Sequence, residues 1–90
     1  SAYLGLSVAR ESGGLVITKL TPGGPAAQAG LLVGDRIQSV VRGKQNAPIV
    51  TKRDLASALK AAGQGTEVVF VIVRDAVVER VPVMLGRRRR

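Results

Sequence analysis

The sequence contains no cysteine and no histidine. Without cysteine, the chain can form neither a disulfide framework nor a zinc site with thiolate ligands. Without histidine, it also lacks the usual base that activates a serine or cysteine nucleophile, and the commonest side-chain metal ligand. Its serines match no motif in which lysine replaces that base. We therefore expect no catalytic residue, no metal site and no cofactor in this chain.

Aromatic residues and long apolar runs are also scarce. Tyr3 and Phe70 are the only aromatic residues, so a core must be built from Val, Leu, Ile and Ala within the 46% hydrophobic share. The longest uninterrupted apolar run is Val68–Val73, far below the roughly 20 residues of a membrane-spanning helix. Ninety residues suit one compact domain. We expect a single folded domain without a membrane span.

The formal net charge is +8, and Arg87–Arg90 supply four of these charges, which leaves +4 on the rest of the chain. Surfaces that bind single-stranded nucleic acid usually place aromatic side chains among basic ones, and no aromatic residue accompanies this arginine run. We therefore expect a domain over residues 1–86, a basic tail over 87–90 and no specific nucleic-acid partner. The tail is interpreted as an expression remnant or a solvated linker, and attraction of anionic chain ends is the alternative.

Hydrophobic periodicity and turn residues predict five strands and two helices. Leu4, Leu6 and Val8 alternate with small residues, which is typical of a strand with one buried face. The remaining elements expected are strands over 15–20, 37–41, 67–74 and 77–85, helices over 25–29 and 52–62, and a loop over 44–48. This order indicates an α+β fold with a small antiparallel, barrel-like sheet.

Several residues predict the ends and neighbours of these elements. Gly30 supplies the left-handed residue that ends the first helix, and Thr51 with Asp54 forms an acidic variant of a capping box for the second. The nearly continuous apolar run after Glu67 is typical of a central strand, whereas Pro82 indicates an edge or a bulge. Asp35 is expected to satisfy backbone groups of a turn.

Three segments, in the same order and spacing, resemble the PDZ family over nearly the whole chain. Residues 3–6 (Tyr-Leu-Gly-Leu) resemble its carboxylate-binding loop, residues 24–31 followed by 34–37 its central signature, and residues 54–59 its groove helix. The order of the elements starts at the carboxylate-binding loop and ends with a strand after the central one. This order resembles the circularly permuted bacterial type of PDZ domain found in HtrA-like serine proteases. The resemblance implies a PDZ-like small antiparallel β-barrel or sandwich of about five strands capped by two helices.

The resemblance also implies a binding site for the carboxyl end of a protein chain. Backbone N–H groups of a glycine-containing loop can form an anion nest, and a ligand strand can extend a sheet edge. The implied loop comprises Tyr3, Leu4, Gly5 and Leu6, and the implied peptide groove between strand 4–10 and helix 52–62 comprises Ser7, Val8, Ala9, Lys52, Ala56 and Leu59. Lys52 lies where the family reads the residue two before the ligand's end, and a plain surface lysine is the alternative.

The implied ligands are C-terminal peptides with an apolar last residue. The implied parent is an HtrA-like envelope protease whose substrate-binding or regulatory domain is this chain, in the periplasm or another extracytoplasmic compartment. A scaffold domain of a non-protease envelope protein is the alternative, and a charged-polymer binder acting through the arginine tail is a third. Two departures from the family, at residues 41–43 and at Asp75-Ala76, leave the local turn types open.

Overall fold

The computed structural model describes residues 2–87, and its elements follow the order that the sequence predicts, with three short additional strands. The elements are β1 (Ala2–Tyr3), β2 (Leu6–Glu11), β3 (Gly14–Leu20), α1 (Pro25–Ala29), β4 (Arg36–Arg42), β5 (Gln45–Pro48), α2 (Lys52–Ala62), β6 (Glu67–Arg74), β7 (Val77–Met84) and β8 (Gly86–Arg87). The predicted α+β class is confirmed. Among the described residues, no helix is long and apolar enough to span a bilayer.

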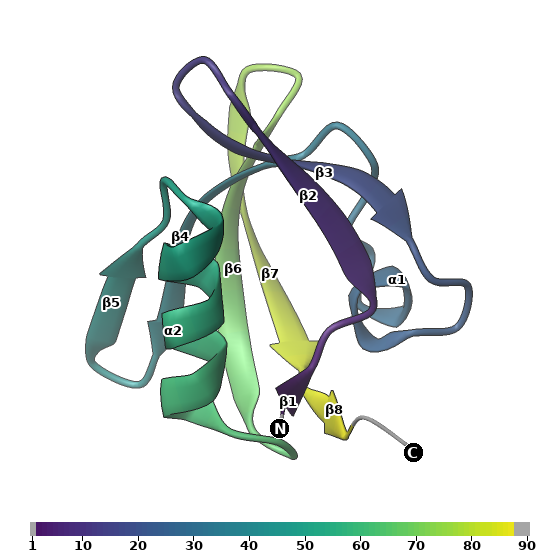
Figure 1. The fold of residues 1–90 in the computed structure, drawn as a ribbon, viewed down its shortest axis with the longest axis vertical. Helices are drawn as coiled ribbons and strands as arrows, with labels where there is room; N and C mark the ends of the chain where they lie inside the picture. The colour runs from purple at the N-terminus through teal and green to yellow at the C-terminus, as the bar shows by residue number, and fades with distance from the viewer. Residues whose placement is uncertain (1, 88–90) are drawn as a thin grey trace.

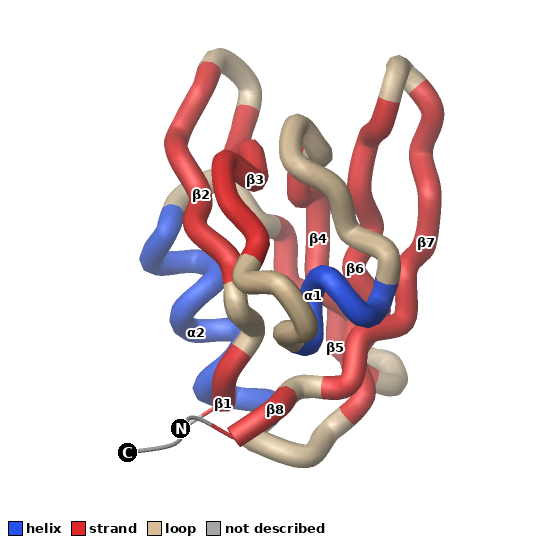
Figure 2. The backbone as a smooth tube through the Cα atoms, turned by 90° about the vertical axis from the view of Figure 1, so that its right-hand side faces the viewer, coloured by secondary structure: helices blue, strands red, loops and turns tan. Residues whose placement is uncertain are grey.

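One antiparallel sheet has the strand order β2-β3-β4-β6-β7, and β5 pairs with β4 beside this path. The strand β6 is central, and the strand β7 that carries Pro82 is an edge, both as predicted. A separate two-stranded sheet joins β1 to β8 and thereby brings the two ends of the described chain together (Figure 1). The helices lie apart from each other, with α2 alongside β2 and α1 next to β7 and β8 (Figures 1 and 2).

The predicted loop over 44–48 is wrong, because Gln45–Pro48 form β5 and pair with Ser39–Arg42 of β4. A two-residue turn at Gly43-Lys44 closes this hairpin, with Gly43 at φ +58°. The segment is polar and mostly exposed, so its pairing depends on backbone hydrogen bonds and gives no hydrophobic periodicity. The first predicted strand also begins later than expected, since Leu4 and Gly5 separate β1 from β2.

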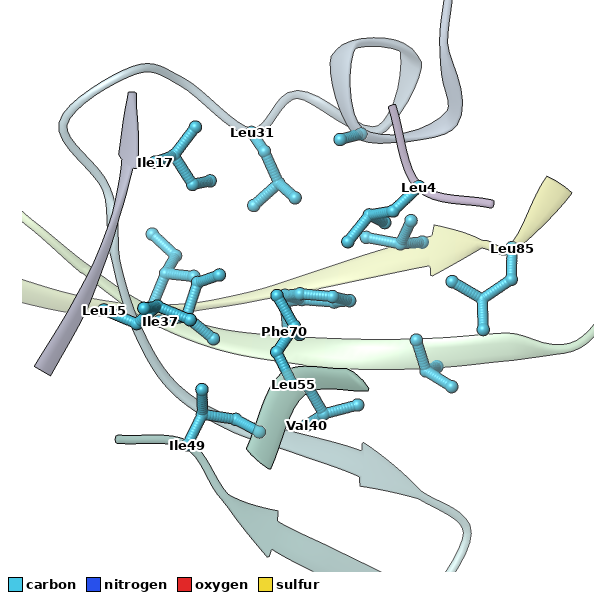
Figure 3. Close-up of a cluster of buried hydrophobic side chains, with 14 residues drawn as sticks. Leu4, Leu15, Ile17, Leu31, Ile37, Val40, Ile49, Leu55, Phe70 and Leu85 are labelled. Carbon is cyan, nitrogen blue, oxygen red and sulfur yellow. The ribbon is translucent and has the colours of Figure 1, made fainter. Parts of the chain in front are cut away.

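The core is aliphatic around one aromatic ring, as the composition predicts. Phe70 on β6 is fully buried. Figure 3 shows it within the cluster of apolar side chains, with Leu55 of α2 next to it. The buried cluster also includes Leu4, Leu15, Ile17, Ala26, Leu31, Ile37, Val40, Ile49, Leu55, Val68, Ile72, Val83 and Leu85. Because Leu4 and Leu55 belong to it, the core reaches the space between β2 and α2.

The helix α2 has the predicted bounds because both of its ends are specified locally. Thr51 Oγ1 accepts a hydrogen bond from Asp54 N at 3.1 Å, and Asp54 Oδ2 accepts from Thr51 N at 3.0 Å, which completes the predicted capping box. At the other end, Gly63 adopts φ +83° and its N–H donates to Leu59 O. These caps fix the position of the helix along the groove described below.

A buried ion pair ties the segment after α1 to the central strand. Asp35, which is 1% exposed, accepts hydrogen bonds from Arg74 Nε at 2.8 Å and Arg74 Nη2 at 2.7 Å. Its Oδ2 also accepts from Leu32 N at 2.8 Å, which confirms the predicted role in a turn. Burial raises the pKa of Asp35, but the hydrogen bonds from Arg74 and Leu32 and the Arg74 charge lower the pKa below its usual value.

The β6–β7 hairpin turns through two residues in the left-handed region. Arg74 pairs with Val77, and Asp75 and Ala76 between them adopt φ +50° and +65°. Positive φ at both central positions is the mark of a type I′ turn, which glycine or asparagine normally occupies. An alanine in this region places its Cβ too close to the following carbonyl oxygen, at a cost of about 1–2 kcal/mol.

The variant Ala76→Gly should therefore raise the free energy of unfolding by about 1 kcal/mol, since it relieves the strained Cβ. Urea denaturation measures this change. The same substitution at the exposed mid-helix Ala56 is the control, and it should lower stability by about 0.5–1 kcal/mol because glycine is unfavourable within a helix. A loss of stability in both variants would contradict the left-handed geometry at residue 76.

Candidate functional site

An open groove of about 620 Å³ runs between β2 and α2, the two elements seen side by side in Figure 1. The loop between β1 and β2 closes one end of it. Its lining consists of Ala2, Tyr3, Leu4, Gly5, Leu6, Ser7, Val8, Lys19, Leu20, Thr21, Pro22, Lys52, Leu55, Ala56 and Leu59. The groove therefore has a backbone loop at one end, a strand edge along one side and a helix along the other.

The carbonyl groups of the β1–β2 loop are held by neighbouring backbone. Leu4 O accepts a hydrogen bond from Ala26 N at 2.9 Å, and Gly5 O accepts from Thr21 N at 2.9 Å. The described chain has no cis peptide bond, so the N–H of each following residue points opposite to these carbonyls. The N–H groups of Gly5 and Leu6 are thus directed away from α1 and β3. Two consecutive N–H groups with this common direction can bind an anion.

Gly5 is required by the conformation and by the packing of this loop. Its φ of +74° lies in the left-handed region, and a Cβ at this position would lie 3.2 Å from Tyr3 Oη and 3.4 Å from Gly24 Cα. A side chain would therefore both strain the backbone and push against the next loop. The glycine therefore lets the loop pack closely against the loop that contains Thr21 and Gly24.

The strand β2 presents a free edge to the groove, because it ends the strand order and, in the described part of the chain, pairs only with β3. Leu6 lies opposite Leu20, and the bond from Thr21 N to Gly5 O makes this a non-hydrogen-bonded pair. The N–H and C=O of Leu6 consequently face away from β3, toward the open edge. An extended chain lying in the groove could pair with these groups.

Apolar side chains from both sides line the groove next to the loop. Leu6 and Val8 contribute from β2, and Leu55, Ala56 and Leu59 contribute from α2. Leu55 is also a buried member of the core, and Leu59 packs against the core while remaining partly exposed. The apolar groove and the core are thus contiguous. Such a surface can accept an aliphatic side chain of modest size.

The structure gathers most of the predicted site residues in this one groove. Nine of the ten line it, and Ala9 lies further along β2, beyond the last lining residue Val8. Sequence reasoning missed Ala2, Lys19, Leu20, Thr21, Pro22 and Leu55. Leu55 lies in the segment that resembles the groove helix but is not among the groove residues that the resemblance implies. The end of β3 enters the groove through a pairing register that no local motif specifies.

The expected tail begins beside this site. Arg87 belongs to β8 and lies opposite Ala2, and Gly86 lies opposite Tyr3. The last described residue is therefore adjacent to the strand that leads into the β1–β2 loop, as the permuted topology implies. Arg88–Arg90, the rest of the expected tail, lie outside the described residues.

Comparison with known proteins gives a family match and close structural likenesses. The family model described as "PDZ domain" matches residues 2–85. The HtrA-type protease AlgW, solved with a decapeptide, is 24% identical with a TM-score of 0.82, and the match covers 99% of this chain and 30% of that chain. A serine endoprotease from Yersinia pestis is 27% identical with a TM-score of 0.78, and the match covers 94% of this chain and 28% of that chain.

An isolated domain gives a match over its full length. The PDZ domain of a carboxy-terminal protease from Vibrio cholerae, solved in complex with a peptide, is 25% identical with a TM-score of 0.82, and the match covers 98% of this chain and 96% of that chain. No curated protein gives a significant match.

The family match occupies nearly all of the chain, whereas the chain spans only about 30% of the AlgW sequence and 28% of the Yersinia sequence. It is thus a binding module and not a catalytic domain. Its likeness to HtrA-type proteases agrees with the resemblance drawn from the loop and groove-helix motifs. The chain belongs to the PDZ family.

Proposed function

We propose that this domain captures the carboxyl end of a protein chain, which adds to the edge of β2 as a further strand. The observation that carries the proposal is the pair of N–H groups of Gly5 and Leu6. The carbonyl groups of the same two peptide bonds, Leu4 O and Gly5 O, accept hydrogen bonds from α1 and from Thr21, so the N–H groups point the other way. A carboxylate loses water when it binds, and preorganised N–H donors replace that water without further ordering of the protein. The loop supplies such donors at the closed end of the groove.

The apolar lining next to the loop determines which last residue fits. A ligand whose carboxylate lies at Gly5 and Leu6 places its last side chain between β2 and α2, against Leu6 and Leu59. Burial of a valine, leucine or isoleucine side chain contributes about 1.5–3 kcal/mol to the binding free energy relative to an exposed one. We infer that terminal Val, Leu, Ile or Ala is preferred over polar residues, with dissociation constants in the micromolar range.

Short peptides that differ only in the last residue test this preference by fluorescence anisotropy. Terminal Val should bind about 10-fold or more tightly than terminal Ser, because the pocket is apolar. The variant Leu59→Ala should weaken the Val peptide and reduce this ratio. Met84→Ala, at an exposed position outside the groove, is the control and should change neither. Equal affinities for all last residues would contradict the proposed pocket.

The larger context proposed is an HtrA-like serine protease of a bacterial periplasm or another extracytoplasmic compartment, with this domain as its substrate-binding or regulatory part. The likeness to AlgW and to the Yersinia endoprotease supports it. A scaffold domain of a non-protease envelope protein is the second candidate, since the groove lies within this chain and would bind a chain end with or without an attached protease. A trypsin-like domain encoded within about 200 residues upstream would decide for the protease.

A further inference from the structure

Among the residues that the structure describes, the charged side chains that line the groove are both lysines. Lys19 lies near the end of β3 and Lys52 at the start of α2, and both are exposed. The lining contains neither Asp nor Glu. Within residues 2–87, both ion pairs involve Arg74, so neither groove lysine is paired with a carboxylate there. The groove therefore presents positive charge to a ligand on two sides.

The register of β2 and β3 gives the position of Lys19 relative to the strand edge. Ser7 lies opposite Lys19, one step beyond the pair of Leu6 and Leu20. Opposed residues of an antiparallel pair share one face of the sheet. Leu6 and Leu20 pack against the core, whereas Ser7 and Lys19 are exposed on the other face. Lys19 is therefore separated from the open edge of β2 only by the small side chain of Ser7.

A ligand whose carboxyl end lies at Gly5 and Leu6 must run antiparallel to β2, since β2 leads away from the loop. Side chains alternate between the two faces of a strand. When the last side chain enters the apolar groove on the Leu6 face, the penultimate side chain lies on the Ser7 face. Strands are spaced about 4.8 Å apart, so an extended lysine on β3 can reach across Ser7 to a carboxylate on the added strand.

We propose that Lys19 selects ligands with an aspartate or glutamate as the penultimate residue. The inference rests on the proposed capture of a chain end and adds the chemistry of one ligand position to it. Lys52 does not serve the same position, because it lies on α2, across the groove from β3. The ligand class is an acidic chain end with an apolar last residue.

Three short peptides that end in Ser-Glu-Val, Ser-Gln-Val or Ser-Lys-Val test this proposal by anisotropy at low salt. An exposed ion pair at this position should make the Glu peptide bind about 2–5-fold more tightly than the Gln peptide, with the Lys peptide weakest. About 0.5 M NaCl should remove most of the difference by screening. In Lys19→Gln the Glu and Gln peptides should bind equally, and in Lys19→Glu the order should reverse.

Lys60→Glu is the matched control, because it makes the same charge change at an exposed residue of α2 that does not line the groove. It should keep the order of the three peptides, because a charge outside the groove acts only weakly, through the net charge of the protein. Equal binding of the three peptides by the wild type, with a free carboxyl end still required, would overturn the role of Lys19 and leave chain-end capture intact. Failure of all three peptides to bind would overturn both.

Discussion

Replacing Asp35 by asparagine should lower the free energy of unfolding by about 2–3 kcal/mol, because a buried amide cannot replace the charge-assisted hydrogen bonds that the carboxylate accepts from Arg74. The carboxylate is 1% exposed and holds both Arg74 and the N–H of Leu32. Arg74 Nη2 also donates to Gly30 O at 3.0 Å, so the same contact secures the end of α1. Since domains are stable by only about 5–15 kcal/mol, this is a large share.

Urea denaturation monitored by circular dichroism measures the loss, and Glu79→Gln is the matched control. Glu79 Oε2 lies 3.7 Å from Arg74 Nη1 and its side chain is 46% exposed, so its removal should change stability by at most about 0.5 kcal/mol. A similar small effect of both substitutions would show that the buried pair does not hold the fold together.

The lowered pKa of Asp35 also predicts how stability depends on pH. A carboxyl whose pKa is lower in the folded state stabilises the fold fully above its unfolded pKa of about 3.9, and this contribution is lost as the pH falls through the folded pKa. Hydrogen bonds from the N–H groups of Val50 and Thr51 also lower the pKa of Asp54, but Asp54 is present in both wild type and Asp35→Asn and does not affect their difference. Unfolding curves of wild type and Asp35→Asn should therefore converge below about pH 4.

The elements that sequence reasoning predicted correctly are those whose signals are local. The bounds of α2 follow from Thr51, Asp54 and Gly63, and α1 ends at Gly30, whose φ is +93°. By contrast, β1 and β8 are two residues each, too short to show any periodicity. Their pairing depends on the approach of two segments at opposite ends of the sequence, which no local pattern specifies.

The lining of the groove was predictable to a similar degree and for the same reason. The loop around Gly5 and the helix face with Leu59 have recognisable motifs, and both line the groove. Lys19 could not be found, because the register between β2 and β3 shifts between Ser7 and Val8, and such a shift has no sequence signal in either strand. The pair of Asp35 and Arg74, 39 residues apart, was missed because ion pairs at this separation follow only from the tertiary fold.

Conversion of the ligand's terminal carboxylate to an amide should weaken binding about 100-fold. The N–H groups of Gly5 and Leu6 are fixed in direction by the bonds that hold the carbonyls of Leu4 and Gly5, so they suit an anion and gain little from a neutral amide. Loss of the hydrogen bonds to a charged group costs about 2.7 kcal/mol here, which corresponds to a 100-fold increase in the dissociation constant. The apolar contacts of the last side chain remain and account for residual binding.

Isothermal titration calorimetry of one peptide ending in valine, in its free-acid and amidated forms, tests chain-end capture most directly. A second amidated peptide with an added aspartate at its amino-terminal end restores the net charge of the free acid and separates carboxylate recognition from general attraction to a basic protein. We predict micromolar binding of the free acid and a loss of about 100-fold for both amides. Equal affinities for the free acid and the amides would contradict the assignment of the β1–β2 loop as a carboxylate site.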